Sequence, residues 1–198
     1  ILMTKLNKKS VETHVKETQG MIQNYATNEK NTWDVSANGD GSVTATLLDD
    51  GTLTISGTGK MKDWVYTDTT DWHNSEIKEK VKKVIISNGV TSIGKYGFYE
   101  CNSLISIKIP SSVTSIGYFA FYKCSSLTSI NIPSGVTSIE SGTFERCSSL
   151  TSINIPEGVI SIVGNAFSEC SSLTEIKVDE KNQNYIDDNG VLYTKDKK

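Results

Sequence analysis

Hydrophobic residues recur with a period of 23 through the middle of the chain. The most regular series are listed by residue type: Phe98, Phe121, Phe144 and Phe167; Cys101, Cys124, Cys147 and Cys170; Leu104, Leu127, Leu150 and Leu173; Ile107, Ile130, Ile153 and Ile176; Ile109, Ile132, Ile155 and Val178. One such unit is too small to offset the entropy of ordering its own residues, so it should not fold alone. The period therefore predicts copies stacked into a solenoid.

Each unit is predicted to contain a short strand, an extended piece and a turn. The segment SLTSINIP (126–133) is rich in β-branched residues and stops at Pro133, which indicates a strand with Leu127, Ile130 and Ile132 pointing inward. Successive strands should form a parallel sheet. The VTSI motif supplies a second short extended piece, and the stretch from Phe to Cys a tight or 3₁₀-like turn.

Small residues are expected where the chain turns. Those before each phenylalanine indicate a crowded corner: Gly97, Ala120, Thr143 and Ala166. Gly89, Gly135 and Gly158 follow the strand ends, where a turn with positive φ would explain them, although Ser112 stands at the matching place in another unit.

These residues resemble a known family. The pattern LxxIxI followed by Pro, with GVTSIGxxAFxxC before it, closely resembles the BspA-like (bacterial surface antigen) class of leucine-rich repeat over residues 77–178. Val81, Val84 and Ile86 fit a degenerate first coil. The resemblance implies a mainly β solenoid, a right-handed leucine-rich repeat horseshoe with short parallel strands.

Both flanks of the repeats look suited to cover the ends of the stack. Residues 31–76 predict a β-hairpin cap, because SVTATLLDDGTLTISGTG alternates apolar and polar residues around Asp50-Gly51. Trp33, Trp64 and Trp72 are predicted to pack this cap on the first coil, and an exposed tryptophan would instead be a ligand platform. Residues 179–198 resemble a hairpin-like cap or a continuation of the array.

Residues 1–30 predict an amphipathic N-terminal helix. Apolar residues have mostly helical spacing at Leu2, Leu6, Val11, Val15, Ile22 and Tyr25. Two roles remain open: a helix that packs on the cap or frays in solvent, and the lower part of a longer helix that anchors or assembles the protein, as in pilin-like subunits.

Charge argues against two classes of partner. The 198 residues include 20 basic and 23 acidic side chains, a net charge of −3, and the basic ones form no stripe. Nucleic acid and anionic membrane surfaces are therefore disfavoured. No apolar run approaches the roughly 20 residues that span a bilayer, so no part of this chain is predicted to cross a membrane.

No catalytic, cofactor or metal site is predicted. His14 and His73 lie outside the repeats, and each is expected to be a solvated surface histidine. The four cysteines lack CxxC spacing and occupy the same place in successive coils, which favours a buried column of free thiols over a zinc site or disulfides. The segment 36–41 (SANGDG) superficially resembles a calcium loop, but two ligand positions, Ser36 and Leu47, do not fit, which favours a β-turn.

The strand-bearing face is the candidate interaction surface. Its outward positions form two columns, the first being Lys83, Ser106, Ser129, Ser152 and Glu175, and the second Ile85, Lys108, Asn131, Asn154 and Lys177. Such a face can accept a protein segment or a glycan, and it can equally be ordinary solvated β surface.

The function expected from the resemblance is non-catalytic recognition outside the cell or at its surface. Adhesion to host matrix or cell-surface proteins is the role implied. The alternative is a structural subunit of a pilus-like or scaffold assembly that displays the repeats. The ligand and the oligomeric state are not predicted.

Overall fold

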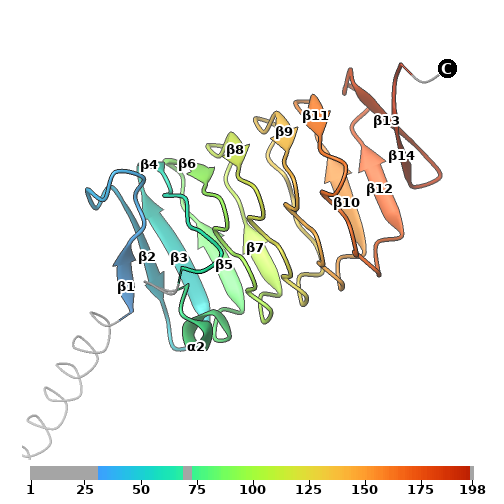
Figure 1. Cartoon of the computed structure of the whole chain (residues 1–198). Coiled ribbons are helices and arrows are strands. Elements are labelled where there is room, and N and C mark those ends of the chain that lie inside the picture. Colours follow the sequence, from blue (N-terminus) through green and yellow to red (C-terminus); the bar gives the residue numbers. More distant parts are fainter. Residues whose placement is uncertain (1–30, 69–72, 197–198) are drawn as a thin grey trace, which may run out of the picture.

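Equivalent residues of successive 23-residue units lie side by side in a row of stacked coils (Figure 1). The structure is a computed structural model that describes residues 31–68 and 73–196. These residues are mostly strands, turns and loops, and α2 (Ser75–Lys78) is a single turn of helix whose first amide groups are capped by Asn74. None of the sheets that they form closes on itself.

Two rows of short parallel strands run along the stack. The first row contains β3 (Thr52–Gly57), β5 (Lys83–Ile86), β7 (Ser106–Lys108), β10 (Ser152–Ile155) and β12 (Glu175–Val178). The second row, from the predicted extended pieces, contains β4 (Gly59–Lys60), β6 (Val90–Ile93), β8 (Ser115–Ile116), β9 (Ser138–Ile139) and β11 (Ser161–Ile162). Within the repeats, paired residues are 23 apart, as in Val84↔Ile107 and Ile153↔Ile176. The period therefore sets the register directly.

The prediction of a strand in the segment 126–133 is wrong, because the structure contains no strand there. Of this segment only Asn131 pairs, in an isolated bridge to Asn154. Two amide-to-carbonyl distances beside it are long, 3.5 Å from Thr128 to Ile105 and 3.4 Å from Thr151 to Thr128, so the ladder weakens here. The inward side chains Leu127, Ile130 and Ile132 are nevertheless all buried.

A third set of inter-coil hydrogen bonds follows the corner between Phe and Cys, and we call it the corner ladder. The backbone N–H groups of Phe98, Phe121 and Phe144 donate to the carbonyls of Ala120, Thr143 and Ala166 at 2.7–2.9 Å. The residue before each of the first three cysteines donates in the same way, for example Arg146 to the Ser168 carbonyl at 2.8 Å.

The corner ladder depends on left-handed backbone at ordinary residues. The residue before each cysteine has a positive φ: Glu100 57°, Lys123 58°, Arg146 62° and Glu169 57°. Such a conformation costs roughly 1–2 kcal/mol for a residue with a side chain. Bonds from Cys101 to the Phe98 carbonyl and from Cys124 to the Phe121 carbonyl close 3₁₀-like turns at these corners, as predicted.

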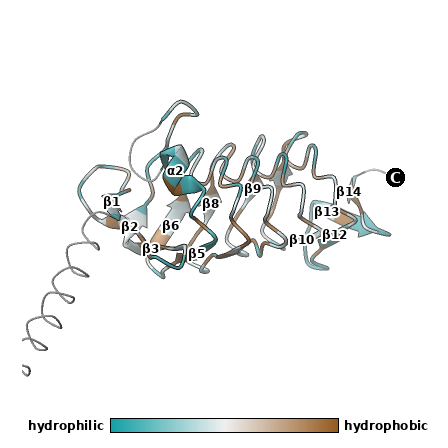
Figure 2. Cartoon of the chain, turned by 90° about the horizontal axis from the view of Figure 1, so that it is seen from below, coloured by the Kyte–Doolittle hydropathy of each residue, from teal (hydrophilic) through white to brown (hydrophobic). Residues whose placement is uncertain are grey.

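The core lies between the strand rows and the corner. The rings of Phe98, Phe121, Phe144 and Phe167 stack in one column, with centroids 5.4–5.7 Å apart and planes within 10° of parallel. The first three rings are fully buried, whereas Phe167 in the last coil is half-buried. In Figure 2 hydrophobic positions recur from coil to coil along the stack. The predicted inward positions are confirmed.

The glycines after the strands have different reasons for being glycine. Gly89 has a positive φ of 103°, as predicted, but Gly135 and Gly158 do not. A Cβ atom at Gly158 would lie 2.1 Å from the backbone oxygen of Ser134 in the preceding coil. At Gly135 the nearest atom would be the Thr114 methyl group at 3.2 Å. Close approach of coils, not turn conformation, therefore explains Gly158.

A three-stranded antiparallel unit begins the stack. Strand β1 (Thr32–Asp34) pairs with β2 (Val43–Leu47), which pairs with β3 across the Asp50-Gly51 turn. Gly51 has a φ of 85°, as such a turn requires. Because β3 also pairs in parallel with β5, this hairpin supplies the first member of the strand row.

A second hairpin, β13 (Tyr185–Asp188) with β14 (Val191–Thr194), follows the last coil. Asn182 joins it to the stack and is completely buried. Its amide nitrogen donates to the carbonyls of Pro156 and Val159 at 2.8 and 2.9 Å. Its side-chain oxygen accepts the amides of Asn184 and Tyr185 at 2.8 Å each. The two donors and the two acceptor lone pairs of this side chain are thereby all used.

The predicted helix over residues 1–30, with His14, and the predicted packing of Trp72 lie outside the described residues. Within residues 31–68 and 73–196, no helix has the length and apolar content needed to cross a membrane.

Candidate functional site

On the strand-bearing face, some but not all successive residues within each of the two predicted columns are paired. In the first column, Lys83 pairs with Ser106 and Ser152 with Glu175. In the second, Ile85 pairs with Lys108, and Asn131 with Asn154, which pairs with Lys177. No pair in the described part of the chain joins Ser106 and Lys108 to Ser129 and Asn131, because the ladder weakens at that step.

The outward side chains of these columns are mostly exposed, and their centre is uncharged. Ser129, Asn131 and Asn154 are exposed, and Ser152 is half-buried. At the last coil, Lys177 Nζ lies 3.2 Å from a Glu175 carboxylate oxygen. An open groove of about 520 Å³ runs along the strand ends, lined by Asn131, Asn154 and Lys177 together with Pro133 and Pro156. The groove offers amide donors and acceptors beside apolar proline rings.

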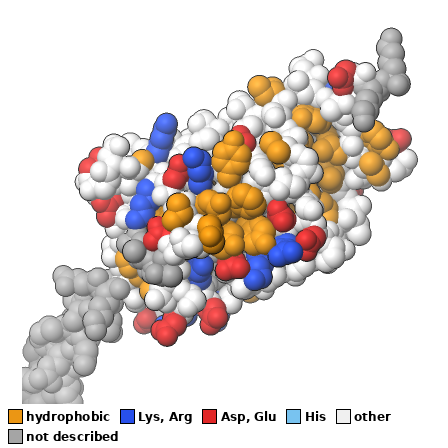
Figure 3. All heavy atoms as spheres, in the orientation of Figure 1, with side chains coloured by type: hydrophobic (Ala, Val, Ile, Leu, Met, Phe, Trp, Pro, Cys, Tyr) orange, Lys and Arg blue, Asp and Glu red, His pale blue; other side chains and the backbone are white. Residues whose placement is uncertain are grey.

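A second surface, missed at the sequence level, lies over the corner ladder. Four aromatic rings from two coils pack together: Tyr96 stacks on Phe119 with centroids 5.4 Å apart, and Tyr99 on Tyr122 at 4.9 Å. All four are half-buried. Figure 3 shows hydrophobic side chains gathered in the middle of one face with Lys, Arg, Asp and Glu side chains around them.

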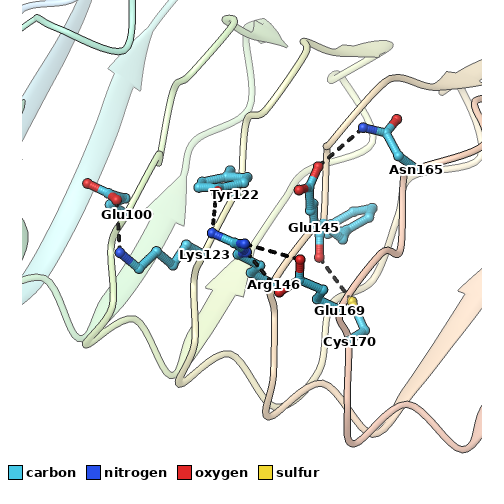
Figure 4. Close-up of polar contacts among 9 residues, drawn as sticks. Glu100, Tyr122, Lys123, Glu145, Arg146, Asn165, Glu169 and Cys170 are labelled. Carbon is cyan, nitrogen blue, oxygen red and sulfur yellow. Dashed lines mark hydrogen bonds and ion pairs between the residues drawn. The ribbon is translucent and has the colours of Figure 1, made fainter.

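Charged residues on the corner ladder link successive coils. Figure 4 shows Arg146 between Tyr122 of the preceding coil and Glu169 of the next. Its guanidinium donates to both carboxylate oxygens of Glu169 at 2.9 and 3.1 Å and to the Tyr122 hydroxyl at 2.9 Å. The bonds to Glu169 and its charge raise the pKa of the Arg146 guanidinium. Lys123 forms a second ion pair between coils, with its Nζ atom 3.0 Å from a carboxylate oxygen of Glu100 in the preceding coil. The charged residues of these two pairs each directly precede a cysteine. Their spacing of 23 residues was therefore the sequence signal that could have predicted contacts between successive coils.

The cysteines form the predicted column of free thiols. Cys101, Cys124 and Cys147 are fully buried, and Cys170 is half-buried. The thiols of Cys124, Cys147 and Cys170 each donate to a phenylalanine carbonyl of the preceding coil at 3.0–3.1 Å. Burial raises the pKa of the Cys101 thiol to about 12 and that of Cys124 well above its usual value. These thiols are therefore protonated and unsuited to nucleophilic chemistry.

The expectation of a solvated His73 is wrong. The side chain is 2% exposed, and its ring stacks on Trp64 with centroids 4.6 Å apart. Nε2 lies 3.2 Å from the Gly97 carbonyl oxygen. Burial lowers the pKa of His73 to about 4. Trp64 is 2% exposed, so its predicted packing role is confirmed, and Trp33 is half-buried against the core.

The loop at residues 34–42 uses its polar groups internally. Asp34 accepts bonds from the amides of Ser36 and Gly41, and Asp40 accepts one from the Ser42 amide. Bonds from Ser36 and from Ser42 lower the pKa of Asp34 and of Asp40 respectively, that of Asp40 to about 2. Residues 31–68 and 73–196 contain no group of three or more His, Cys, Asp or Glu arranged to hold a metal ion.

Comparisons with known proteins agree with the repeat geometry. The family model described as BspA type leucine rich repeat region (6 copies) matches residues 76–193. A leucine-rich repeat protein from Eubacterium ventriosum is 29% identical with a TM-score of 0.65, over 83% of this chain and 48% of that one. The chain thus spans about half the length of that relative. No curated protein matches.

Two further solved structures share the fold. The T. pallidum leucine rich repeat protein is 22% identical with a TM-score of 0.51, over 69% of each chain. The pneumococcal vaccine antigen PcpA is 17% identical with a TM-score of 0.54, over 78% of this chain and 53% of that one.

Proposed function

The chain belongs to the BspA type of leucine-rich repeat proteins, and from this premise we propose that it is a recognition module that binds a protein or a glycan through its strand-bearing face. Proteins built from such repeats are typically non-catalytic and bind other proteins. The module acts at the cell surface or outside the cell, where its role is adhesion to host matrix or cell-surface proteins. We also propose that the stack winds with a right hand and curves as a horseshoe. The proposed boundaries between the N-terminal helix, the hairpin cap, the repeats and the C-terminal segment follow residues 30, 76 and 178.

The observation that carries this proposal is the pair of polar columns with a groove beside them. The parallel register places outward side chains of equal position next to one another, for example Asn131 beside Asn154. Serine hydroxyls and asparagine amides can each donate and accept, so they can bind peptide groups or sugar hydroxyls. The neighbouring Pro133 and Pro156 add apolar contact in the groove.

The test is to replace Ser129, Asn131, Ser152 and Asn154 together by Lys. Four cations on this face should abolish complementarity to a partner bound there and leave the fold intact, because the four positions point outward. Binding of the parent and variant would be compared on a glycan array and on a panel of immobilised extracellular-matrix proteins. A control with four Lys replacements at exposed positions off this face and its groove, Thr67, Thr114, Thr137 and Ser171, should bind like the parent.

If every partner bound by the parent is bound equally well by the strand-face variant, the strand face is not the binding surface. In that case the alternative role, a subunit of a pilus-like or scaffold assembly that displays the repeats, gains support.

A further inference from the structure

The two strand rows are closed at the C-terminal end of the stack by the second hairpin. In the first row, the amide of Ile176 donates to the Gly190 carbonyl at 3.1 Å, and that of Val178 to an Asp187 carboxylate oxygen at 2.7 Å. In the second row, the amide of Ile162 donates to the Tyr185 hydroxyl at 2.9 Å. Residues of the hairpin thus substitute for the next coil.

The corner ladder is left open at the same end. Phe167 and Glu169 hold the places of Phe144 and Arg146, and Glu169 has the same left-handed backbone, with a φ of 57°. In the preceding coil these two amides donate to the following coil at 2.8–2.9 Å. Nothing in residues 31–68 and 73–196 accepts a hydrogen bond from the amides of Phe167 and Glu169. Two donors in a repeated, preformed geometry therefore face outward.

An apolar cleft of about 460 Å³ lies beside these donors. Its lining includes Val163, Phe167, Leu192 and Tyr193, from the last coil and β14. The Phe167 ring has Phe144 on one face, 5.7 Å away, but remains half-buried because the column ends there. Val163 and Tyr193 are 38% and 43% exposed. The cleft can therefore admit another apolar side chain.

Within the stack, the same pair of amide donors occurs three more times, and each time the following coil covers it. The donors of one coil bind the carbonyls of a small residue before a phenylalanine and of the residue after it, as in Ala120-Phe121-Tyr122. The phenylalanine ring stacks on the ring of the preceding coil. We propose that the open corner binds a peptide segment of a partner protein in which a small residue precedes an aromatic one. Its carbonyls accept from Phe167 and Glu169, and its ring stacks on Phe167.

A second copy of this chain does not offer that segment at the start of its stack. There the counterparts of the required acceptors are the carbonyls of Gly97 and Tyr99, and that of Gly97 is already occupied by His73. His73 Nε2 lies 3.2 Å from the Gly97 carbonyl oxygen, and the Phe98 ring is completely buried, so it cannot stack on Phe167 of another copy. The site is therefore suited to a foreign segment, and it is separate from the strand-bearing face.

The test uses a capped peptide of residues 139–148 with serine at the Cys147 position, which contains Thr143-Phe144-Glu145. It would be titrated to millimolar concentration into the isotope-labelled chain while amide resonances are followed. We expect saturable shifts at Phe167 and Glu169. A peptide with Phe144→Ala should bind at least about tenfold more weakly, because it lacks the ring.

Two protein variants locate the site. A side chain at Gly164 would begin in the lining of the cleft and meet no atom within 4 Å, so Gly164→Gln should fold normally and weaken the peptide by at least about tenfold. Ser171→Gln, at an exposed position of the same coil outside the cleft, should leave binding unchanged. The four-Lys strand-face variant should also bind the peptide normally, even if the proposed function is wrong.

Absence of shifts at Phe167 and Glu169 would overturn the proposal. It would also be overturned if folded Gly164→Gln bound the peptide as well as the parent does, or if the strand-face variant lost the peptide.

Discussion

His73 substitutes for a missing coil at the start of the stack. Elsewhere in the corner ladder, the carbonyl before a phenylalanine accepts a backbone amide of the preceding coil. Gly97 precedes the first phenylalanine of the series, and His73 Nε2 contacts its carbonyl instead. Because a carbonyl only accepts, the neutral imidazole must carry its proton on Nε2. A side chain thus completes a backbone ladder.

This burial predicts a pH-dependent stability. The pKa of His73 is about 4 in the folded chain, below the 6.5 of an ordinary histidine. As the pH falls, the unfolded chain therefore binds a proton before the folded one does. The neutral, buried His73 therefore adds to the free energy of unfolding fully above pH 6.5. This addition, up to about 3 kcal/mol, is lost as the pH falls from 6.5 to 4. Urea unfolding of the parent between pH 4 and 8 would measure this loss.

The control is His73→Phe, which keeps a ring beside Trp64 and removes the titrating group. It leaves the Gly97 carbonyl without its bond and should cost about 1–3 kcal/mol at pH 8. Its stability should fall less steeply than that of the parent between pH 6.5 and 4. Equal slopes would mean that other groups cause the acid loss.

Within one coil, burial is more robust than strand pairing. At residues 127–132 the pairing is reduced to a single bridge, yet the inward side chains remain buried. Side-chain alternation alone decides which residues face the core, whereas pairing requires amide and carbonyl groups of two coils to approach closely. The coil therefore depends on its apolar positions more than on its ladder.

That dependence predicts different outcomes for neighbouring residues. Ile130 is 6% exposed and Ser129 is exposed. Ile130→Asp places an unpaired carboxylate in the core and should lower the free energy of unfolding by about 3–5 kcal/mol. Ser129→Asp should change it by no more than about 0.5 kcal/mol. Urea melts of both variants by circular dichroism test this pair, and a similar loss in both would contradict the assignment of the inward positions.

The same distinction explains what could be predicted from sequence. Inward positions such as Phe144 and Leu150 follow from apolar periodicity, and the register follows from its constancy. The corner ladder was not predictable, because it uses backbone groups, and Glu100 or Lys123 carry no sign of a positive φ. The outward columns were placed by alternation, but the aromatic cluster of Tyr96, Tyr99, Phe119 and Tyr122 arises from neighbouring coils.

Across the whole molecule, each coil contacts its neighbours along the stack, so stability is close to a sum of local contributions. Side chains of different segments close part of each end: His73 covers the corner ladder at the start, and Asn182 with the second hairpin covers the strand rows at the finish. Weakening one closure should therefore open the nearest coils first and leave distant coils closed.

The cysteine column can report this opening. Cys147 lies in the coil that contains Pro156 and Val159, and Cys101 lies in the first of the four coils. Both thiols are completely buried, so each should react with a thiol reagent only when its coil opens. Asn182→Ala leaves the Pro156 and Val159 carbonyls without their bonds. A local loss of about 2 kcal/mol would speed labelling of Cys147 about thirtyfold and that of Cys101 much less. Mass spectrometry of each labelled cysteine measures both rates, and equal acceleration would show that the stack opens as one unit.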